Sequence, residues 1–283
     1  MTYVINDKAR NISQLNRYML AKTLSMFDYS GLPDSVPQKE LEKLLQTHGY
    51  AFYTEIDDVP YVLWGGMGGE LDEYYNPTEI VIHNPALGIN KNFNIKEDGV
   101  LIKNDDMEVG LLPLFERFNT LMIENQINMD MHGFNSRALK LISASDDRTR
   151  ESAELFLKKL RNGESAVIGD NAMFEGVKVH TSNSGGSSTL VHLIEYQQYL
   201  KAALYNEVGI SAPSNMKRER LNSGEVNQQE DALMIFVDSM LKCRKEAIQK
   251  INEKHSENID VKFSGVWERK DEAESESRII VPD

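Results

Sequence analysis

Apolar residues recur at steps of three and four along most of the chain, the spacing that gathers side chains on one face of a helix. This pattern predicts amphipathic helices over residues 12–29, 38–47, 111–131, 190–208 and 230–254. Three of these helices are expected to stop at a glycine, because Gly31, Gly49 and Gly209 each follow the last apolar position. The stripe of residues 12–29 is broad, so we expect that helix to be covered on more than one side.

Between residues 50 and 103 the apolar period changes from 3.6 to about 2, which favours strands. Strands are predicted over residues 50–56, 59–64, 78–83, 91–95 and 99–103. The turn signals Asp57-Asp58, Asn84-Pro85 and Asp98-Gly99 separate them, as does a glycine cluster at residues 65–69. Because Asp98-Gly99 favours a tight primed turn, residues 90–102 are predicted to form a hairpin within a small antiparallel sheet module.

Residues 136–186 mix the two periods, with a helix predicted over 147–160 and short strands over 166–168 and 177–179. Near the end of the chain, residues 258–267 predict one further strand. The charged tail that follows is expected to be disordered apart from Ile279-Ile280-Val281. Long helices and short antiparallel strands together predict an α+β fold.

A polar stretch, residues 216–229, lies between the last two predicted helices, the second of which is expected to begin with Glu230 and Asp231 in its first turn. Long connections without structure are uncommon in compact domains, so this one is either functional or a solvated, mobile link. Three cations, Lys217, Arg218 and Arg220, fall within five residues of a chain whose net charge is -13. A basic loop on an acidic protein suits a polyanion that must slide past without adhering.

The chain has 283 residues, of which 41% are hydrophobic and 27% charged, and this composition predicts a soluble protein of one large or two modest domains. The single cysteine, Cys243, cannot form an internal disulfide and falls on or beside an apolar stripe, which favours a buried thiol and an intracellular setting. No run of eighteen apolar residues and no signal segment is present, so neither membrane spanning nor secretion is expected.

Candidate chemistry is sparse. The six histidines show no pair at metal-ligand spacing, so no metal site is expected. In the glycine cluster, Glu70 stands where a P-loop needs lysine and Leu71 where a third glycine belongs, which favours a flexible strand end over a nucleotide site. The acidic pairs are expected to face water in turns, as at Asp57-Asp58, Asp105-Asp106 and Asp146-Asp147. No catalytic residues and no cofactor are predicted.

The order of these elements resembles the portal protein, also called head-tail connector or upper collar protein, of small short-tailed bacteriophages. The resemblance covers about residues 12–263 and is carried by three stretches: Leu41-Glu42-Lys43 running to Gly49-Tyr50 and Phe52; Lys217-Arg218-Glu219-Arg220-Leu221 with Glu225-Val226; and residues 245–253 leading into Val261-Lys262-Phe263.

The resemblance implies a ring-forming portal fold with stem helices around a channel, an outer wing of small sheets, a mixed α/β clip and a helical crown. In this sequence the implied divisions are an N-terminal arm and stem helix (1–34), the wing (35–110), a stem helix (111–135), the clip (136–188), a stem helix (189–210), the channel loop (211–229), a wing or crown helix and strand (230–265) and an acidic disordered tail (266–283).

The function implied by the resemblance is that of a ring of about twelve subunits at one capsid vertex, through which double-stranded DNA is packaged, retained and ejected. Lys217, Arg218 and Arg220 would contact phosphate in the channel, with Glu219 paired to one of them. The implied partners are the capsid and scaffolding protein, a packaging ATPase and a lower collar or tail protein. The implied location is the head-tail vertex of the virion, after assembly in the host cytoplasm.

The N-terminus departs from one pattern of this family. Members that bind a packaging RNA have a strongly basic N-terminus, whereas Lys8, Arg10 and Arg17 stand here against Asp7, which argues against RNA binding. Two other classes of function stay open. One is a nucleic-acid-binding module that grips phosphate with residues 217–220 without forming a ring, although the net acidity argues against it. The other is an enzyme that binds a nucleotide at the glycine cluster.

Overall fold

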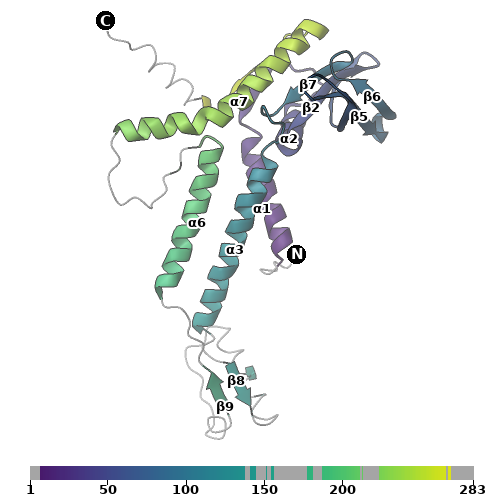
Figure 1. Ribbon diagram of the computed structural model, residues 1–283. Coiled ribbons are helices and arrows are strands. Elements are labelled where there is room, and N and C mark those ends of the chain that lie inside the picture. Colours follow the sequence, from purple (N-terminus) through teal and green to yellow (C-terminus); the bar gives the residue numbers. More distant parts are fainter. Residues whose placement is uncertain are drawn as a thin grey trace, which may run out of the picture. The chain divides into compact units, whose positions relative to one another are not determined.

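The computed structural model describes residues 7–137, 141–144, 151, 154–155, 177–180, 187–210, 212, 223–265 and 267–268 (Figure 1). The chain divides into two compact units, one formed by Met1–Lys8 with Leu121–Tyr199 and the other by Ala9–Thr120 with Leu200–Asp283. The helices are joined by short antiparallel strands, so the predicted α+β class is confirmed.

Two three-stranded antiparallel sheets dominate the second unit. Strand β2 (Tyr50–Ile56) is central in one sheet, between β3 (Val59–Leu63) and β7 (Gly99–Lys103). In the other sheet β5 (Pro77–Asn84) is central, between β4 (Gly66–Leu71) and β6 (Ile89–Asn94). An apolar cluster joins them, formed by Phe52, Leu63, Ile80, Ile82 and Phe93. The alternating pattern therefore predicted these strands correctly, with the exception of β4.

The predicted hairpin over residues 90–102 is wrong. The chain does turn after Asn94, whose carbonyl accepts a hydrogen bond from the Asp98 amide at 2.9 Å, but β6 pairs with β5 while β7 pairs with β2. The reason is burial: Phe93 of β6 packs against Phe52 of the other sheet, with ring centroids 5.9 Å apart. The turn thus carries the chain from one layer to the other, and each strand finds a partner within its own layer.

The glycine cluster is an ordered strand rather than a flexible strand end. Residues 66–69 of the cluster belong to β4, which runs antiparallel to β5 with a register shift between Gly68 and Leu71. A side chain at Gly65 would bring its Cβ to 2.2 Å from the Val81 carbonyl oxygen, so the glycine permits close approach to the neighbouring strand. The cluster serves strand pairing, and its backbone forms no helix-capping phosphate loop.

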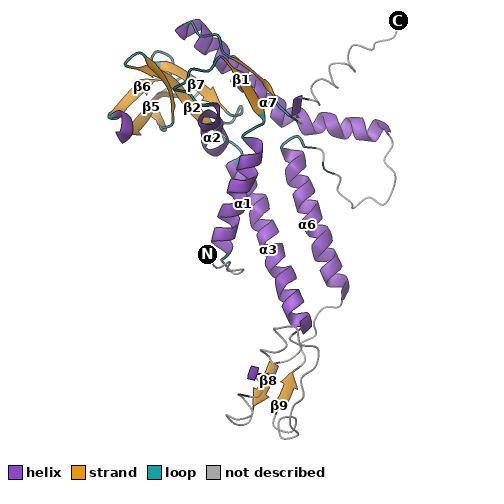
Figure 2. Cartoon of the chain, turned by 180° about the vertical axis from the view of Figure 1, so that it is seen from behind, coloured by secondary structure: helices purple, strands orange, loops and turns teal. Residues whose placement is uncertain are grey.

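The first helix is shorter than predicted. Helix α1 spans Lys8–Thr23, and the last residues of the expected helix instead form strand β1 (Phe27–Ser30), antiparallel to β10 (Asp260–Phe263). The rings of Phe27 and Phe263 stack with centroids 5.5 Å apart, so the apolar residues at the end of the broad stripe are buried by a strand partner. Strand β10 packs against α7 (Ser223–His255), and Figure 2 shows its partner β1 beside this helix. Strand β10 covers only part of the predicted strand at residues 258–267.

The helix α2 (Gln38–His48) confirms the prediction for residues 38–47, and Gly49 ends it as expected. Gly49 has a φ of 86°, in the left-handed region that glycine occupies without strain, and its amide donates to the Leu45 carbonyl at 2.8 Å. Strand β2 begins at the next residue, so this cap fixes the angle at which α2 enters the sheet.

Three long helices complete the described structure: α3 (Leu112–Arg137), α6 (Ser187–Glu207) and α7 (Ser223–His255). Helix α7 begins seven residues before Glu230, so the predicted loop at residues 216–229 is too long at its C-terminal end. Its first turns are rich in Glu and Gln, which favour helix without an apolar stripe. The apolar period could not detect them.

In the first unit, α3 and α6 are joined through Asn125, whose side-chain amide donates at 2.8 Å to both the Leu193 carbonyl and Gln197 Oε1. Strands β8 (Leu141–Ala144) and β9 (Val177–His180) pair antiparallel, which confirms the strand predicted at residues 177–179. The helix predicted at 147–160 lies largely outside the described residues, and the strand at 166–168 lies wholly outside them.

Candidate functional site

The three predicted loop cations, Lys217, Arg218 and Arg220, lie outside the described residues. The structure does describe the two ends from which their loop departs, namely the end of α6 at Glu207 and the start of α7 at Ser223. Both ends belong to the second unit, and the contacts that the structure gives are those of the end that follows α6.

The N-terminal end of the loop is fixed by backbone hydrogen bonds after α6. The amide of Gly209 donates to the Asn206 carbonyl at 3.0 Å and that of Ile210 to the Tyr205 carbonyl at 2.9 Å, while the Ala212 amide donates to Asn206 Oδ1 at 3.0 Å. Gly209 has a φ of 74°, and a Cβ there would lie 2.9 Å from Val237 of α7. The predicted stop at Gly209 is confirmed, and it is also a point of close packing between the two helices.

Trp267, near the C-terminal end of the sequence, contacts the same segment that follows α6. Its side chain is buried, and its Nε1–H donates to the Val208 carbonyl at 2.8 Å. This carbonyl lies just past the end of α6, where no further turn of helix can use it. The second residue of the predicted tail at 266–283, Trp267, is therefore packed, whereas residue 266 and the residues after Glu268 lie outside the described part of the chain.

Replacing Trp267 by Phe is expected to reduce the free energy of unfolding by about 1 kcal/mol, because the Val208 carbonyl would be left buried without a donor. Urea unfolding followed by circular dichroism measures this change. Trp64→Phe is the matched control: Trp64 is 44% exposed, so water can replace contacts that it loses, and a smaller effect is expected. Equal losses from the two variants would contradict the role given to the Val208 contact.

Helix α7 is fixed by one fully buried cation, Arg244. Its guanidinium forms a bidentate pair with Glu42 of α2, with Nε to Oε1 at 2.8 Å and Nη2 to Oε2 at 2.9 Å. Nη2 also donates to Asn104 Oδ1 at 2.9 Å, and Nη1 donates to the carbonyls of Asn104 at 3.1 Å and Met240 at 3.0 Å. All five N–H groups of the guanidinium are therefore used.

The carboxylate of Glu42 is equally well satisfied. Tyr29 donates to Oε1 at 2.5 Å and the Gln46 side chain to Oε2 at 2.8 Å, while the Phe27 ring lies over the guanidinium with 4.1 Å from Cζ to the ring centroid. Burial and the facing Glu42 carboxylate raise the pKa of Tyr29 well above its usual value. Burial alone would lower the pKa of Arg244, but Glu42 and Tyr29 raise it overall, so the guanidinium is held charged.

The expectation that the acidic pair Asp105-Asp106 faces water holds for Asp106, which is exposed, and is wrong for Asp105. Asp105 is buried and organises the β7–α3 connection, accepting hydrogen bonds from the amides of Met107, Val109 and Gly110 at 2.9–3.2 Å. Asp106 accepts from Ser239 at 3.0 Å and from Cys243 at 3.5 Å, which ties the connection to α7, and these two hydrogen bonds lower its pKa. Cys243 is buried as predicted, and burial raises its pKa to about 11.

The part of the chain that the structure describes holds neither a metal centre nor a membrane-spanning helix. Within those residues, no cluster of three or more His, Cys, Asp or Glu side chains is arranged to hold a metal ion. No described helix combines the length and apolar character that crossing a bilayer requires. The ordered contacts in this region connect helices, strands and loop ends, and they present no constellation of reactive groups.

Comparison with known families decides the identity. The sequence model of the family Phage Connector (GP10) matches residues 4–266, which is nearly the whole chain. The chain belongs to the phage connector family. Connectors of this family are portal proteins, structural rather than enzymatic components of the bacteriophage head-tail junction, and membership implies ring assembly with capsid and tail partners at the head-tail vertex of the virion.

Two solved structures are similar to this connector. A chain from the portal and tail of native bacteriophage P68 is 16% identical, with a TM-score of 0.41, and the match covers 97% of this chain and 95% of that one. An HK97 family phage portal protein from Corynebacterium diphtheriae is 11% identical, with a TM-score of 0.46, and the match covers 100% of both chains.

Sequence reasoning missed the residues that fix the connector's second unit, above all Arg244 and Trp267. A signal for Arg244 was present: it lies four residues after Met240 and seven after Val237, on the apolar stripe of α7. A cation at such a position predicts a buried partner. The identity of that partner, Glu42, comes from 202 positions earlier in the chain and carries no local signal.

Proposed function

We propose that this connector assembles into a closed ring of about twelve subunits, that double-stranded DNA passes through the ring during packaging and ejection, and that the loop before α7 faces the DNA. The observation that carries the proposal is the family match over residues 4–266. The family implies a ring, and a ring at the vertex through which the genome passes must present some surface to DNA.

The charge distribution supports the assignment of the loop. Lys217, Arg218 and Arg220 give a basic segment to a chain of net charge -13. In a ring, an acidic wall repels phosphate and lets DNA slide, while cations repeated at one level hold it through phosphate contacts without reading its sequence. The chain is also fixed at Gly209 before the loop, and α7 begins at Ser223, which limits the length of the loop.

The remaining assignments follow from the same proposal. The sheets within residues 35–110 form the wing, residues 136–188 form the clip that meets a packaging ATPase and later a lower collar or tail protein, and the C-terminal helix contributes to the crown. Assembly takes place in the host cytoplasm with scaffolding protein, without a packaging RNA.

The native mass of the purified connector, with negative-stain images of the same fraction, tests the proposal. A closed ring of about twelve subunits with a central hole is expected, at low and at moderate salt. Because some rings close only around a scaffold, the measurement is repeated after co-expression with the phage's scaffolding protein. A monomer or dimer under both conditions would overturn the ring and leave a non-ring nucleic-acid-binding module as the better account.

A further inference from the structure

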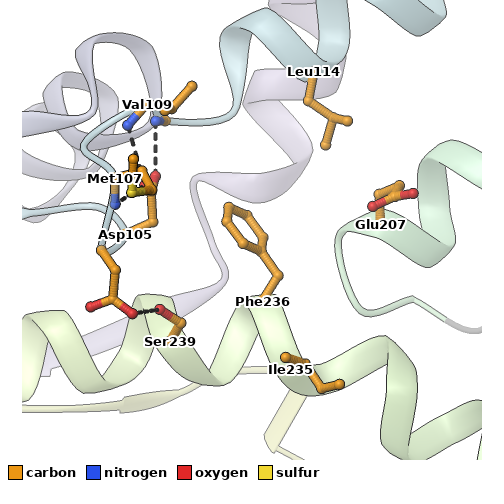
Figure 3. Close-up of a pocket in the computed structure, with 10 residues that line it drawn as sticks. Asp105, Met107, Val109, Leu114, Glu207, Ile235, Phe236 and Ser239 are labelled. Carbon is orange, nitrogen blue, oxygen red and sulfur yellow. Dashed lines mark hydrogen bonds between the residues drawn. The ribbon is translucent and has the colours of Figure 1, made fainter.

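The second unit contains an apolar cavity of about 560 Å³ between the β7–α3 connection, the first turn of α3, the end of α6 and α7 (Figure 3). Figure 3 shows Phe236 and Leu114 directed into the space, with Ile235 and Glu207 on its other side. The cavity is bounded at one end by the connection that Asp105 organises. At the other end it is bounded by the end of α6, next to the Val208 carbonyl that Trp267 contacts.

The rim of this cavity is unusually apolar for an exposed surface. Met107 is 79% exposed, Ile235 72% and Val109 50%, and all three line the same cavity. Single exposed apolar side chains are common, but a group of them around a hollow marks a surface that another segment covers.

The rim also carries negative charge. Asp106 is already bound by Ser239 and Cys243. Glu207 is exposed at the last position of α6, and among the residues that the structure describes no cation pairs with it. A segment that fits this cavity would therefore combine bulky apolar side chains with one cation.

The tail of the chain has this composition. The fifteen residues after Glu268 are mostly charged or small, except for Ile279-Ile280-Val281, which Arg278 immediately precedes. The tail also departs next to the cavity, since Trp267 donates to the carbonyl of Val208, the neighbour of Glu207. Ten residues separate Glu268 from Ile279, enough to span up to about 35 Å when extended.

We propose that Ile279-Ile280-Val281 of the same chain occupies this cavity, with Arg278 paired to Glu207. Because the tether is short, the tail is present at an effective concentration of the order of millimolar, so a contact that is weak between separate molecules suffices to hold it. The docked tail would cover Met107 and Ile235 and fasten α7 to the β7–α3 connection. This inference goes beyond the proposed ring and does not depend on it.

Disulfide trapping in the full chain tests the proposal. In a Cys243→Ser background, which removes the natural thiol and keeps a hydroxyl donor for Asp106, Met107→Cys is combined with Ile280→Cys. Under mild oxidation an intrachain disulfide is expected, seen as a faster band on a non-reducing gel and a mass loss of about 2 Da. The rate is expected to be at least ten times that of a control pair, Met107→Cys with Ala273→Cys, since residue 273 belongs to the same tail but lies outside the apolar triplet.

Two further variants separate docking from chance collision. Ile235→Asp is expected to slow trapping about ten-fold, whereas Ile194→Asp, the same change at an exposed isoleucine of α6 in the other unit, should not. Arg278→Glu is expected to slow trapping two- to five-fold, roughly the weight of an exposed ion pair, and Glu207→Arg in the same chain should restore the rate.

The outcomes are distinct from those of the ring experiment. Equal trapping by residues 273 and 280, or no effect of Ile235→Asp, would overturn the docked tail whatever the native mass. Disulfide-linked dimers in place of intrachain products would also overturn it, because the cavity would then take the tail of a second copy.

Discussion

Replacing Arg244 by methionine is expected to reduce the free energy of unfolding by about 3–5 kcal/mol, a large share of the stability of a typical domain. The side chain of Arg244 is completely buried and so is its partner Glu42. Methionine fills most of the volume but leaves the Glu42 carboxylate without its counter-charge in an interior that solvates it poorly. Urea unfolding monitored by circular dichroism measures the loss.

A matched change on the same helix provides the control. Lys242 lies two residues away, and its side chain is 66% exposed in a loose pair with Glu246 at 3.8 Å. Lys242→Met should change the free energy of unfolding by about 0.5 kcal/mol or less, as is usual for exposed pairs. If the two substitutions had similar effects, the buried pair could not be what fixes α7.

Removing both partners, with Arg244→Met and Glu42→Leu together, takes away the unpaired charge and should be less destabilising than Arg244→Met alone. The double variant will still be less stable than the parent, because Tyr29, Gln46 and Asn104 each lose a hydrogen-bond partner. A double variant that is less stable by the sum of the two single losses would mean that cavity formation, rather than unpaired charge, dominates.

Much of the fold could be predicted from sequence because its signals are local. Helix α2 ends at a left-handed residue, and Gly49 is the residue type that predicts such an end. In β5 the residues 80–83 alternate between buried and exposed, and the period of 2 detects this strand. Cys243 lies on the apolar stripe and is buried. These features are determined within a few residues of sequence.

Which strands pair with each other depends on residues far apart in the sequence, and the wrong predictions concern this pairing. The turn at Asp98 has the chemistry of a hairpin, yet β6 and β7 lie in different sheets because Phe93 packs across to Phe52. Phe27 fits the apolar stripe of a helix equally well, and only pairing with Phe263 makes it part of a strand. The period of the apolar residues indicates which side chains are buried, but it does not indicate which part of the chain they pack against.

The C-terminal end of the candidate loop was predicted wrongly for a different reason. Residues 223–229 include a single bulky apolar residue, Val226, so no apolar stripe marks them, but their backbone is helical and shortens the loop. The cations Lys217, Arg218 and Arg220 stand out in an acidic chain independently of the backbone, and their contact with DNA stays a prediction.

Replacing Lys217, Arg218 and Arg220 together by alanine is expected to leave the ring intact and to reduce the fraction of DNA-filled particles at least ten-fold. In a ring of about twelve copies the change removes about 36 cations from one level of the channel, so counterion release on phosphate binding is lost there. The readout is DNase-protected DNA per particle after packaging, with the native mass of the variant ring measured on the same preparation.

A second triple variant, Lys39→Ala, Lys43→Ala and Lys242→Ala, removes the same charge from exposed positions on α2 and α7 and should retain DNA like the parent. The same retention is then measured at increasing salt concentration. The parent and the control should lose DNA progressively as the salt concentration rises. The retention of DNA by the loop variant, which already lacks those phosphate contacts, should depend less steeply on salt. If the loop variant retained as much DNA as the parent at every salt concentration, these cations could not be what holds the genome, because an electrostatic interaction is lost when its charges are removed.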